Sequence, residues 1–268
     1  MPLLKIKTYF VLTTILVAMV VFSYRGQAKS PFLRIRVIFD NVRYAEQLEC
    51  AWGFSCLIEG MPQPILFDTG SDGHILLANM KKMGIDPSSI QAVFLSHIHG
   101  DHTGGLNLFL QSRPGVTVYL PASFPASLQK SMSALGAEVR ALDKPVKLFD
   151  KVYTTGELGP GIKEQSLVID TPQGLVIVTG CAHPGVVRIV TTTKHWLQKE
   201  VYLLIGGFHL DGQPQRELQR VAEELKKLGV KQIAPSHCTG EAARTLFRER
   251  WGRNFIESGV GAVIELPP

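Results

Sequence analysis

Residues Val93–Leu106 read VFLSHIHGDHTGGL. The first four are apolar or small, which is typical of the end of a buried strand. Four candidate metal ligands then follow within six residues: His97, His99, Asp101 and His102. Imidazole and carboxylate groups are seldom buried without a partner, and a divalent cation accepts electron pairs from both. The stretch therefore predicts a metal site at the end of a strand.

The spacing of the four ligands predicts two adjacent ions. His97 and His99 lie two apart on an extended chain, so their side chains point the same way. The turn at Gly100 directs Asp101 and His102 toward a second point. The alternative, a histidine-rich surface loop, does not explain why these residues directly follow a hydrophobic strand. We therefore expect a dinuclear metal centre.

Charge is distributed unevenly along the chain. The 268 residues carry a net charge of +5, but residues 1–30 hold four basic side chains and no acidic one. Residues 31–268 hold 24 basic and 23 acidic side chains, so this part is almost neutral. A neutral domain lacks the basic surface that binds a phosphate backbone. We therefore expect a small-molecule substrate and no nucleic-acid partner.

Residues 1–30 have the pattern of a signal peptide or an N-terminal membrane anchor. Lys5 and Lys7 precede Tyr9–Tyr24, an uncharged run of 16 residues, and Gly26-Gln27-Ala28 has the small-x-small form of a cleavage site. The run is long for a signal peptide and short for a full membrane span. We therefore expect export to the periplasm or the extracellular space, or anchoring to a membrane. The alternative is a buried first helix.

Segments of strand and helix length alternate through residues 31–268. Leu33–Phe39 alternates apolar and basic side chains and is expected to form the first strand. Gln215–Leu228 has the clearest helical pattern, with an apolar stripe along one face. Another helix is expected near Ala122–Leu135. The pattern predicts one α/β domain, in which two sheets pack back to back with helices outside.

Three later histidines follow predicted strands. His183 lies after the strand expected at Leu175–Thr179, and His237 lies after the strand expected at Gln232–Pro235. Ligands at strand ends can converge on one site, so both are candidate metal ligands, with a structural role as the alternative. His209 follows a third strand and can face the same cleft, where it would bind substrate or transfer a proton. A structural role for His209 fits equally well.

The ordered motifs resemble those of the metallo-β-lactamase superfamily. His97-Ile98-His99-Gly100-Asp101-His102 resembles its HxHxDH signature. Four other motifs resemble one branch, which holds metal-dependent hydrolases similar to the enzyme that makes the aminobenzene–dihydropterin precursor of methanopterin. The resemblance covers residues 31–268 and implies an α/β fold, a four-layer αββα sandwich of two mixed β-sheets with helices on the outer faces. The four motifs are Phe67–Gly70 (FDTG), Thr179–His183 (TGCAH), Gly206–Leu210 (GGFHL) and Pro235–Gly240 (PSHCTG).

The resemblance also implies the metal ligands. His237 corresponds to the last ligand of the superfamily and completes the site of Asp101 and His102. No histidine occurs between His102 and His183, so His183 is the candidate for the remaining ligand of the other ion. The full implied set is His97, His99, Asp101, His102, His183 and His237.

Two more residues are implied beside the metals. Asp68 matches an aspartate that holds metal-binding groups by hydrogen bonds, although a turn after a strand also accounts for it. An aspartic protease would need two such carboxylates, and the chain has one Asp-Thr-Gly triplet. Where the superfamily has a metal-bridging aspartate after Thr-Gly, this chain has Cys181.

The roles of the cysteines stay open. Cys181 either supplies a bridging thiolate or packs in the core while solvent bridges the ions, and we expect packing because cysteine is so often simply buried. Cys238 is also expected to pack. Cys50 and Cys56 either form a disulfide after export or remain free thiols.

The residues favour a metal-dependent hydrolase. Zinc fits the histidine-rich donors, and iron or manganese also fits. Two ions would lower the pKa of a shared water toward ~7 and polarise an ester, phosphoester or lactone, with Asp101 orienting the hydroxide and His209 assisting the leaving group. The alternatives are a transferase similar to the methanopterin-precursor synthase, against which export argues, a non-catalytic metal-binding envelope protein, and a nuclease, which the neutral domain disfavours.

Overall fold

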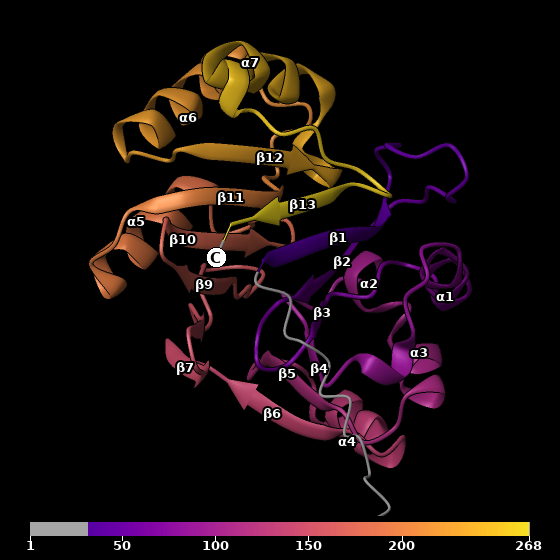
Figure 1. Cartoon of the computed structure of the whole chain (residues 1–268). Coiled ribbons are helices and arrows are strands. Elements are labelled where there is room, and N and C mark those ends of the chain that lie inside the picture. Colours follow the sequence, from indigo (N-terminus) through magenta and orange to yellow (C-terminus); the bar gives the residue numbers. More distant parts are fainter. Residues whose placement is uncertain (1–31, 268) are drawn as a thin grey trace, which may run out of the picture.

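The strands form two sheets at the centre of the molecule (Figure 1). The structure is a computed structural model that describes residues 32–267. Its strands are β1 (Leu33–Asp40), β2 (Phe54–Glu59), β3 (Ile65–Phe67), β4 (Ala92–Phe94), β5 (Thr117–Pro121), β6 (Glu138–Leu142), β7 (Val146–Phe149), β8 (Val152–Thr154), β9 (Leu167–Thr171), β10 (Gly174–Thr179), β11 (Val201–Gly207), β12 (Gln232–Ser236) and β13 (Val263–Leu266).

Both sheets are mixed. The seven-stranded sheet has the order β13-β1-β2-β3-β4-β5-β6, and the six-stranded sheet has the order β12-β11-β10-β9-β8-β7. Strands β3 to β6 run parallel to one another, as do β10 to β12, and the other neighbours are antiparallel. The first strand was expected at Leu33–Phe39, and β1 confirms it with one additional residue.

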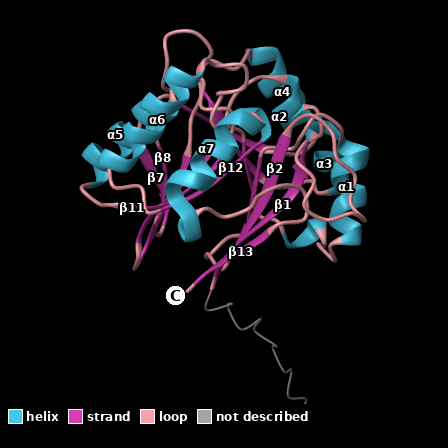
Figure 2. Cartoon of the chain, turned by 90° about the horizontal axis from the view of Figure 1, so that it is seen from above, coloured by secondary structure: helices cyan, strands magenta, loops and turns pink. Residues whose placement is uncertain are grey.

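Helices cover the two outer faces, with the strands between them (Figure 2). The outer face of the seven-stranded sheet shares a buried apolar core with α1, α3 and α4, and the outer face of the other sheet shares one with α5, α6 and α7. The helices are α1 (Gly73–Lys82), α2 (Gly100–Thr103), α3 (Leu106–Ser112), α4 (Ala126–Ala134), α5 (Val186–Leu197), α6 (Gln215–Lys227) and α7 (Glu241–Trp251).

A third apolar core lies between the two sheets. It includes Ile35 and Phe67 from the first sheet and Val178 and Ile205 from the second, all of them almost fully buried. Alternate residues of one strand face opposite sides of its sheet, so each sheet fills an inner and an outer core. The expected four-layer αββα sandwich is therefore confirmed.

Two helices differ from the sequence expectation. The helix expected near Ala122–Leu135 begins only at Ala126, because Pro125 precedes its first turn and cannot donate a hydrogen bond within a helix. Helix α2 was not expected, since its four residues lie inside the ligand motif. The clearest predicted helix is confirmed, because α6 spans nearly the whole of Gln215–Leu228.

The expectation of export or membrane anchoring is corrected. Among residues 32–267, no helix is both long enough and apolar enough to cross a membrane. The segment 1–30, on which the signal peptide or anchor was predicted, lies outside the described residues. Nothing in the described part of the chain supports either, so we withdraw both predictions.

The candidate ligands lie at the carboxyl ends of strands from both sheets. His97 follows β4 in the first sheet, while Cys181 follows β10 and His237 follows β12 in the second. Asp68 follows β3 in the same way. Parallel strands end at a common edge of their sheet, so the loops that carry these residues meet there. The fold thus brings four distant segments of sequence to one place.

Candidate metal centre

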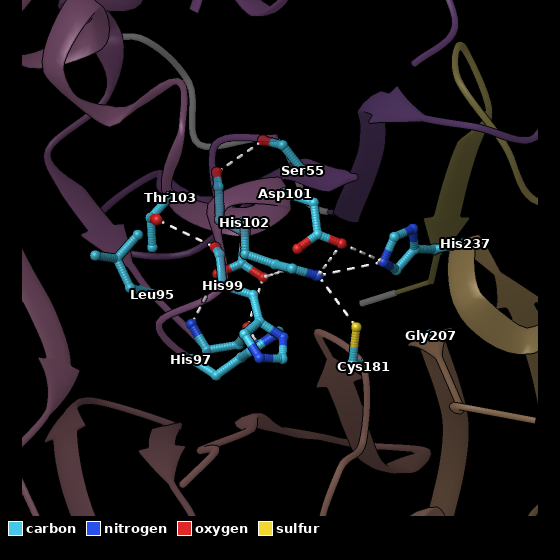
Figure 3. Close-up of polar contacts among 12 residues, drawn as sticks. Ser55, Leu95, His97, His99, Asp101, His102, Thr103, Cys181, Gly207 and His237 are labelled. Carbon is cyan, nitrogen blue, oxygen red and sulfur yellow. Dashed lines mark hydrogen bonds and ion pairs between the residues drawn. The ribbon is translucent and has the colours of Figure 1, made fainter. Parts of the chain in front are cut away.

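The residues of the HxHxDH motif and two distant residues form one compact cluster (Figure 3). His102 Nε2 lies 3.2 Å from His237 Nε2 and 3.2 Å from Cys181 Sγ. Asp101 Oδ2 lies 3.3 Å from His237 Nε2 and 3.6 Å from His102 Nε2. The structure therefore places Asp101 and His102 beside His237, as the sequence predicted, and adds Cys181 to the group.

A second group of donors adjoins the first. His97 Nε2 lies 3.2 Å from His99 Nδ1, and the ring of His183 lies 4.6 Å from that of His97 and 4.9 Å from that of His99. Donor atoms of His97, Cys181 and His183 all fall within 4.8 Å of one another, as do those of His97, His99 and Asp101. The structure thus brings all six predicted ligands together.

In each of the buried rings of His102 and His237, the Nδ1 nitrogen contacts a hydrogen-bond acceptor. Asp68 Oδ2 lies 2.7 Å from Nδ1 of His102, and Asn41 Oδ1 lies 2.8 Å from Nδ1 of His237. These oxygens accept hydrogen bonds, so the proton of each neutral ring is on Nδ1 and the lone pair is on Nε2. The two lone pairs then face each other at 3.2 Å. A positive charge must lie between them, either a proton or a metal ion.

The rings of His97 and His183 are oriented in the same way, by a hydrogen-bond partner at Nδ1. Ser96 donates its hydroxyl proton to Asp68 and can therefore accept from Nδ1 of His97 at 2.9 Å. Glu164 Oε2 accepts from Nδ1 of His183 at 2.8 Å. Both rings then carry their lone pair on Nε2, which in His97 lies 3.2 Å from His99 Nδ1. A hydrogen-bond partner on the opposite ring nitrogen is typical of metal-binding histidines.

The donor spacing fits a transition-metal ion. Donors 2.0–2.3 Å from a tetrahedral ion lie roughly 3.3–3.7 Å from one another. His102 Nε2 lies 3.2 Å from the donor atoms of both Cys181 and His237, and Asp101 Oδ2 lies 3.3–3.6 Å from the two histidine nitrogens. Burial lowers the pKa of both His97 and His102 to about 3, so each ring is neutral at pH 7, as a metal ligand must be. The residues present therefore fit a divalent metal, which the fold also implies.

Asp68 connects the two groups of donors. Its carboxylate accepts hydrogen bonds from the Ser96 amide, the Ser96 hydroxyl and the ring of His102, each at 2.7 Å. Burial raises the pKa of Asp68 to about 8, so a nearby positive charge is needed to keep it ionised at neutral pH. These contacts match the predicted role of holding metal-binding groups by hydrogen bonds.

Glu164 is a site residue that the sequence analysis missed. Its buried carboxylate accepts from the amides of Cys181, Ala182 and His183 at 2.8–3.0 Å, in addition to the ring of His183. It therefore fixes the whole loop after β10. The available signal was an acidic residue three positions before the apolar strand β9, which could have been paired with a histidine that still lacked a hydrogen-bond acceptor.

Several site residues have strained backbones. Asp68, Ala182, His209 and His237 all have positive φ angles, between 51° and 60°. This region is unfavourable for residues other than glycine, and such strain gathers where a structure must aim a side chain. All four lie in loops that carry candidate ligands or adjoin them, so the strain supports a functional site here.

Two further residues adjoin the centre. The exposed ring of His209 lies 4.6 Å from that of His183, so His209 does face the same cleft. Donor atoms of Cys181, His209 and Cys238 lie within 4.8 Å of one another, which the sequence analysis did not expect. Hydrogen bonds from Cys181 and His209 lower the pKa of Cys238 to about 5.

All four cysteines are free, so within the described residues no disulfide joins Cys50 to Cys56.

Comparison with known proteins identifies the family. Residues 53–237, which include the ligand motif and His237, match the profile described as "Metallo-beta-lactamase superfamily". This chain belongs to that superfamily. The resemblance expected from the motifs is therefore confirmed, and so is the branch, as the following relatives indicate.

One curated relative is similar over most of its length. It is the 7,8-dihydropterin-6-methyl-4-(β-D-ribofuranosyl)-aminobenzene-5'-phosphate synthase of Methanocaldococcus jannaschii, 32% identical over 275 residues, covering 84% of this chain and 94% of the relative. Among solved structures, Tm1679, a metal-dependent hydrolase of the β-lactamase superfamily, has a TM-score of 0.75 and 25% identity over 88% of this chain and all of its own. The short form of human tRNase Z, with a TM-score of 0.62 and 16% identity over 88% of this chain and 99% of its own, shares the fold.

Proposed function

We propose that this protein is a metal-dependent hydrolase that acts on an ester, phosphoester, lactone or similar bond of a small molecule. The observation that carries the proposal is the pair of Nε2 lone pairs of His102 and His237, which face each other at 3.2 Å inside a ring of further donors. Packing alone does not explain such a set, because the two lone pairs repel each other unless a proton or a metal ion lies between them.

The candidate ligands divide into two halves. His97, His99 and His183 would hold one ion, and Asp101, His102 and His237 would hold the other. We propose zinc for both positions, with iron or manganese as alternatives that the same donors accept. Two such ions supply Lewis acidity toward a carbonyl or phosphoryl oxygen and a water that is acidic enough to ionise near neutral pH.

Asp101 has the charge state that a water-orienting group requires. Burial alone would raise its pKa, but in the metal-free protein a hydrogen bond from protonated His237 and the neighbouring His102 outweigh burial and hold the pKa well below its usual range. Its carboxylate therefore stays ionised and can accept a hydrogen bond from an attacking water. We assign Asp101 the role of orienting that water toward the substrate.

His209 is placed to act on the leaving group. The hydrogen bond with Cys238 raises the pKa of His209, although partial burial lowers it somewhat. A larger fraction of this ring is then protonated at neutral pH, and its exposed position lets it donate a proton to a departing alkoxide. A cavity of about 200 Å³ opens beside His209 and His183 and has an apolar wall that includes Val186 and Phe208. That volume suits part of a small molecule.

The test combines metal content with a substrate panel. Protein reconstituted with zinc, manganese or iron should bind about two ions per chain. It should hydrolyse at least one member of a panel of phosphodiesters, phosphomonoesters, lactones and thioesters, and a chelator should abolish that activity. Less than a tenth of an equivalent of metal after reconstitution would contradict the proposal. Full metal content without turnover of any panel member would favour a metal-binding protein that is not an enzyme.

A transferase is the second candidate, and the Methanocaldococcus jannaschii synthase favours it because the similarity covers 94% of that protein. The objection to it was export, which nothing in residues 32–267 supports. The test is to supply a dihydropterin compound and a ribofuranosyl-aminobenzene phosphate and to search for the joined product by mass spectrometry. Product formation at a rate above that of panel hydrolysis would make this the function.

A further inference from the structure

Cys181 lies where the two halves of the centre meet. Its side chain is buried, and its donor atom lies within 4.8 Å of those of Asp101, His102 and His237 in one half. The same donor atom lies within 4.8 Å of those of His97 and His183 in the other half. Figure 3 shows its sulfur directed at the Nε2 atom of His102.

The contact between Cys181 and His102 is too short and too polar for simple packing. Sγ lies 3.2 Å from a nitrogen whose proton is on the opposite side of the ring, so the sulfur faces a lone pair. Two ligands of one ion adopt this separation, since nitrogen and sulfur donors of a tetrahedral ion lie roughly 3.5 Å apart. Without metal the Cys181 thiol donates a hydrogen bond to this lone pair, and loss of the thiol proton leaves sulfur and nitrogen placed to hold one ion.

The thiol of Cys238 lies close to Cys181. Cys238 Sγ lies 3.7 Å from the carbonyl oxygen of Cys181. The donor atoms of Cys181, His209 and Cys238 all lie within 4.8 Å of one another. A side chain at Gly207 would place its Cβ 2.7 Å from Cys238 Sγ and 2.4 Å from the carbonyl oxygen of Gly180. Glycine at position 207 therefore leaves room for the Cys238 thiol.

We propose that the Cys181 thiolate is a metal ligand shared by both halves of the centre. This inference rests on the proposed function only in requiring that metal binds. On binding, the Cys181 S–H bond breaks, its proton passes to solvent, and the sulfur electron pair forms the bonds to metal, so no oxidant or reductant is involved. A thiolate also makes the centre select soft or borderline ions such as zinc, cobalt and cadmium over magnesium.

The first test uses cobalt as a spectroscopic probe. Parent protein reconstituted with Co²⁺ should show a thiolate-to-cobalt charge-transfer band in the near ultraviolet. Cys181→Ser should lose this band and bind Co²⁺ at least ~10-fold more weakly, because a hydroxyl is a poorer ligand than a thiolate. Cys181→Asp should bind two ions without the band. Cys50→Ser, whose sulfur belongs to none of these donor groups, should match the parent.

A measurement on the parent protein avoids any dependence on the folding of variants. In protein loaded with two equivalents of cadmium, a shared thiolate should shift both cadmium-113 resonances away from the range of nitrogen and oxygen ligands. A shift of one resonance would show that Cys181 binds one ion and is not shared. Two bound ions without a charge-transfer band or a shifted resonance would overturn thiolate ligation and leave the proposed function intact. Failure to bind either metal would contradict both.

Discussion

Replacing Glu164 with glutamine should destabilise the protein and weaken its metal binding. The carboxylate of Glu164 accepts four hydrogen bonds, two on each oxygen. Glutamine keeps one oxygen, so its NH₂ group must face two donors, either two backbone amides or the amide and ring of His183. Each buried donor left without an acceptor costs about 1–3 kcal/mol, which predicts a loss of about 2–6 kcal/mol.

The pKa of Glu164 gives a second value for the loss of stability expected in Glu164→Gln. Burial alone would raise this pKa, but the hydrogen bonds from His183 and the nearby His97 lower it from 4.5 to about 2. A shift of this size corresponds to about 3 kcal/mol in favour of the folded state. Because the folded pKa is depressed, this stability is fully present above pH 4.5 and is lost as the pH falls toward 2. The two values agree, so we expect a loss of about 3 kcal/mol at pH 7.

The assay is chemical denaturation of parent and Glu164→Gln protein, both freed of metal, at several pH values. The difference in free energy of unfolding should be constant above pH 4.5 and should shrink below it. Metal affinity, measured by competition with a chelator, should fall by about 10- to 100-fold, since His183 loses the group that orients it. Glu138→Gln is the control, because Glu138 lies at the surface and pairs with Arg140 there. A difference below about 1 kcal/mol at pH 7 would refute the reasoning.

The remaining predictions concern the ligand loops and the metal itself. His183→Ala should bind about one ion fewer per chain by elemental analysis, and unchanged metal content would remove His183 from the ligand set. Gly180→Ala would place a Cβ atom 2.1 Å from the Ser96 hydroxyl, so it should lower thermal stability and metal content together, whereas Gly161→Ala, with no atom within 4 Å of its Cβ, should do neither. Chelation should lower the melting temperature of the parent, because the facing lone pairs lose their cation, and it should lower that of His183→Ala by less. Equal shifts for the two proteins would contradict this.

The ligands could be predicted because their chemistry is concentrated in short motifs. His97 to His102 form a dense run after an apolar strand, and His183 and His237 each end a recognisable strand. The layer order followed from the alternation of strands and helices together with the family resemblance. These features depend on local pattern, which a sequence carries directly.

The partners of the ligands could not be predicted because they are distant in sequence. Asn41 contacts the ring of His237 across 196 positions, and Cys238 approaches Cys181 across 57. Glu164 is a single acidic residue without a motif, and only the folded loop shows that four donors converge on it. Export was predicted from the apolar run in residues 1–30, which lie outside the described residues, and no helix among residues 32–267 is long and apolar enough to cross a membrane.

The pairing of β13 with β1 has a consequence for the timing of assembly. Arg34 and Glu265, which pair across these strands, are 231 positions apart. Contacts this distant close late in folding, because the chain must first lose the entropy of a long loop. While the chain emerges from the ribosome, strand β1 lacks its partner β13. An ion that meets the nascent chain at this stage finds the HxHxDH motif without His237. The full set of candidate ligands is therefore assembled only when the chain has folded, well after the HxHxDH motif has been synthesised.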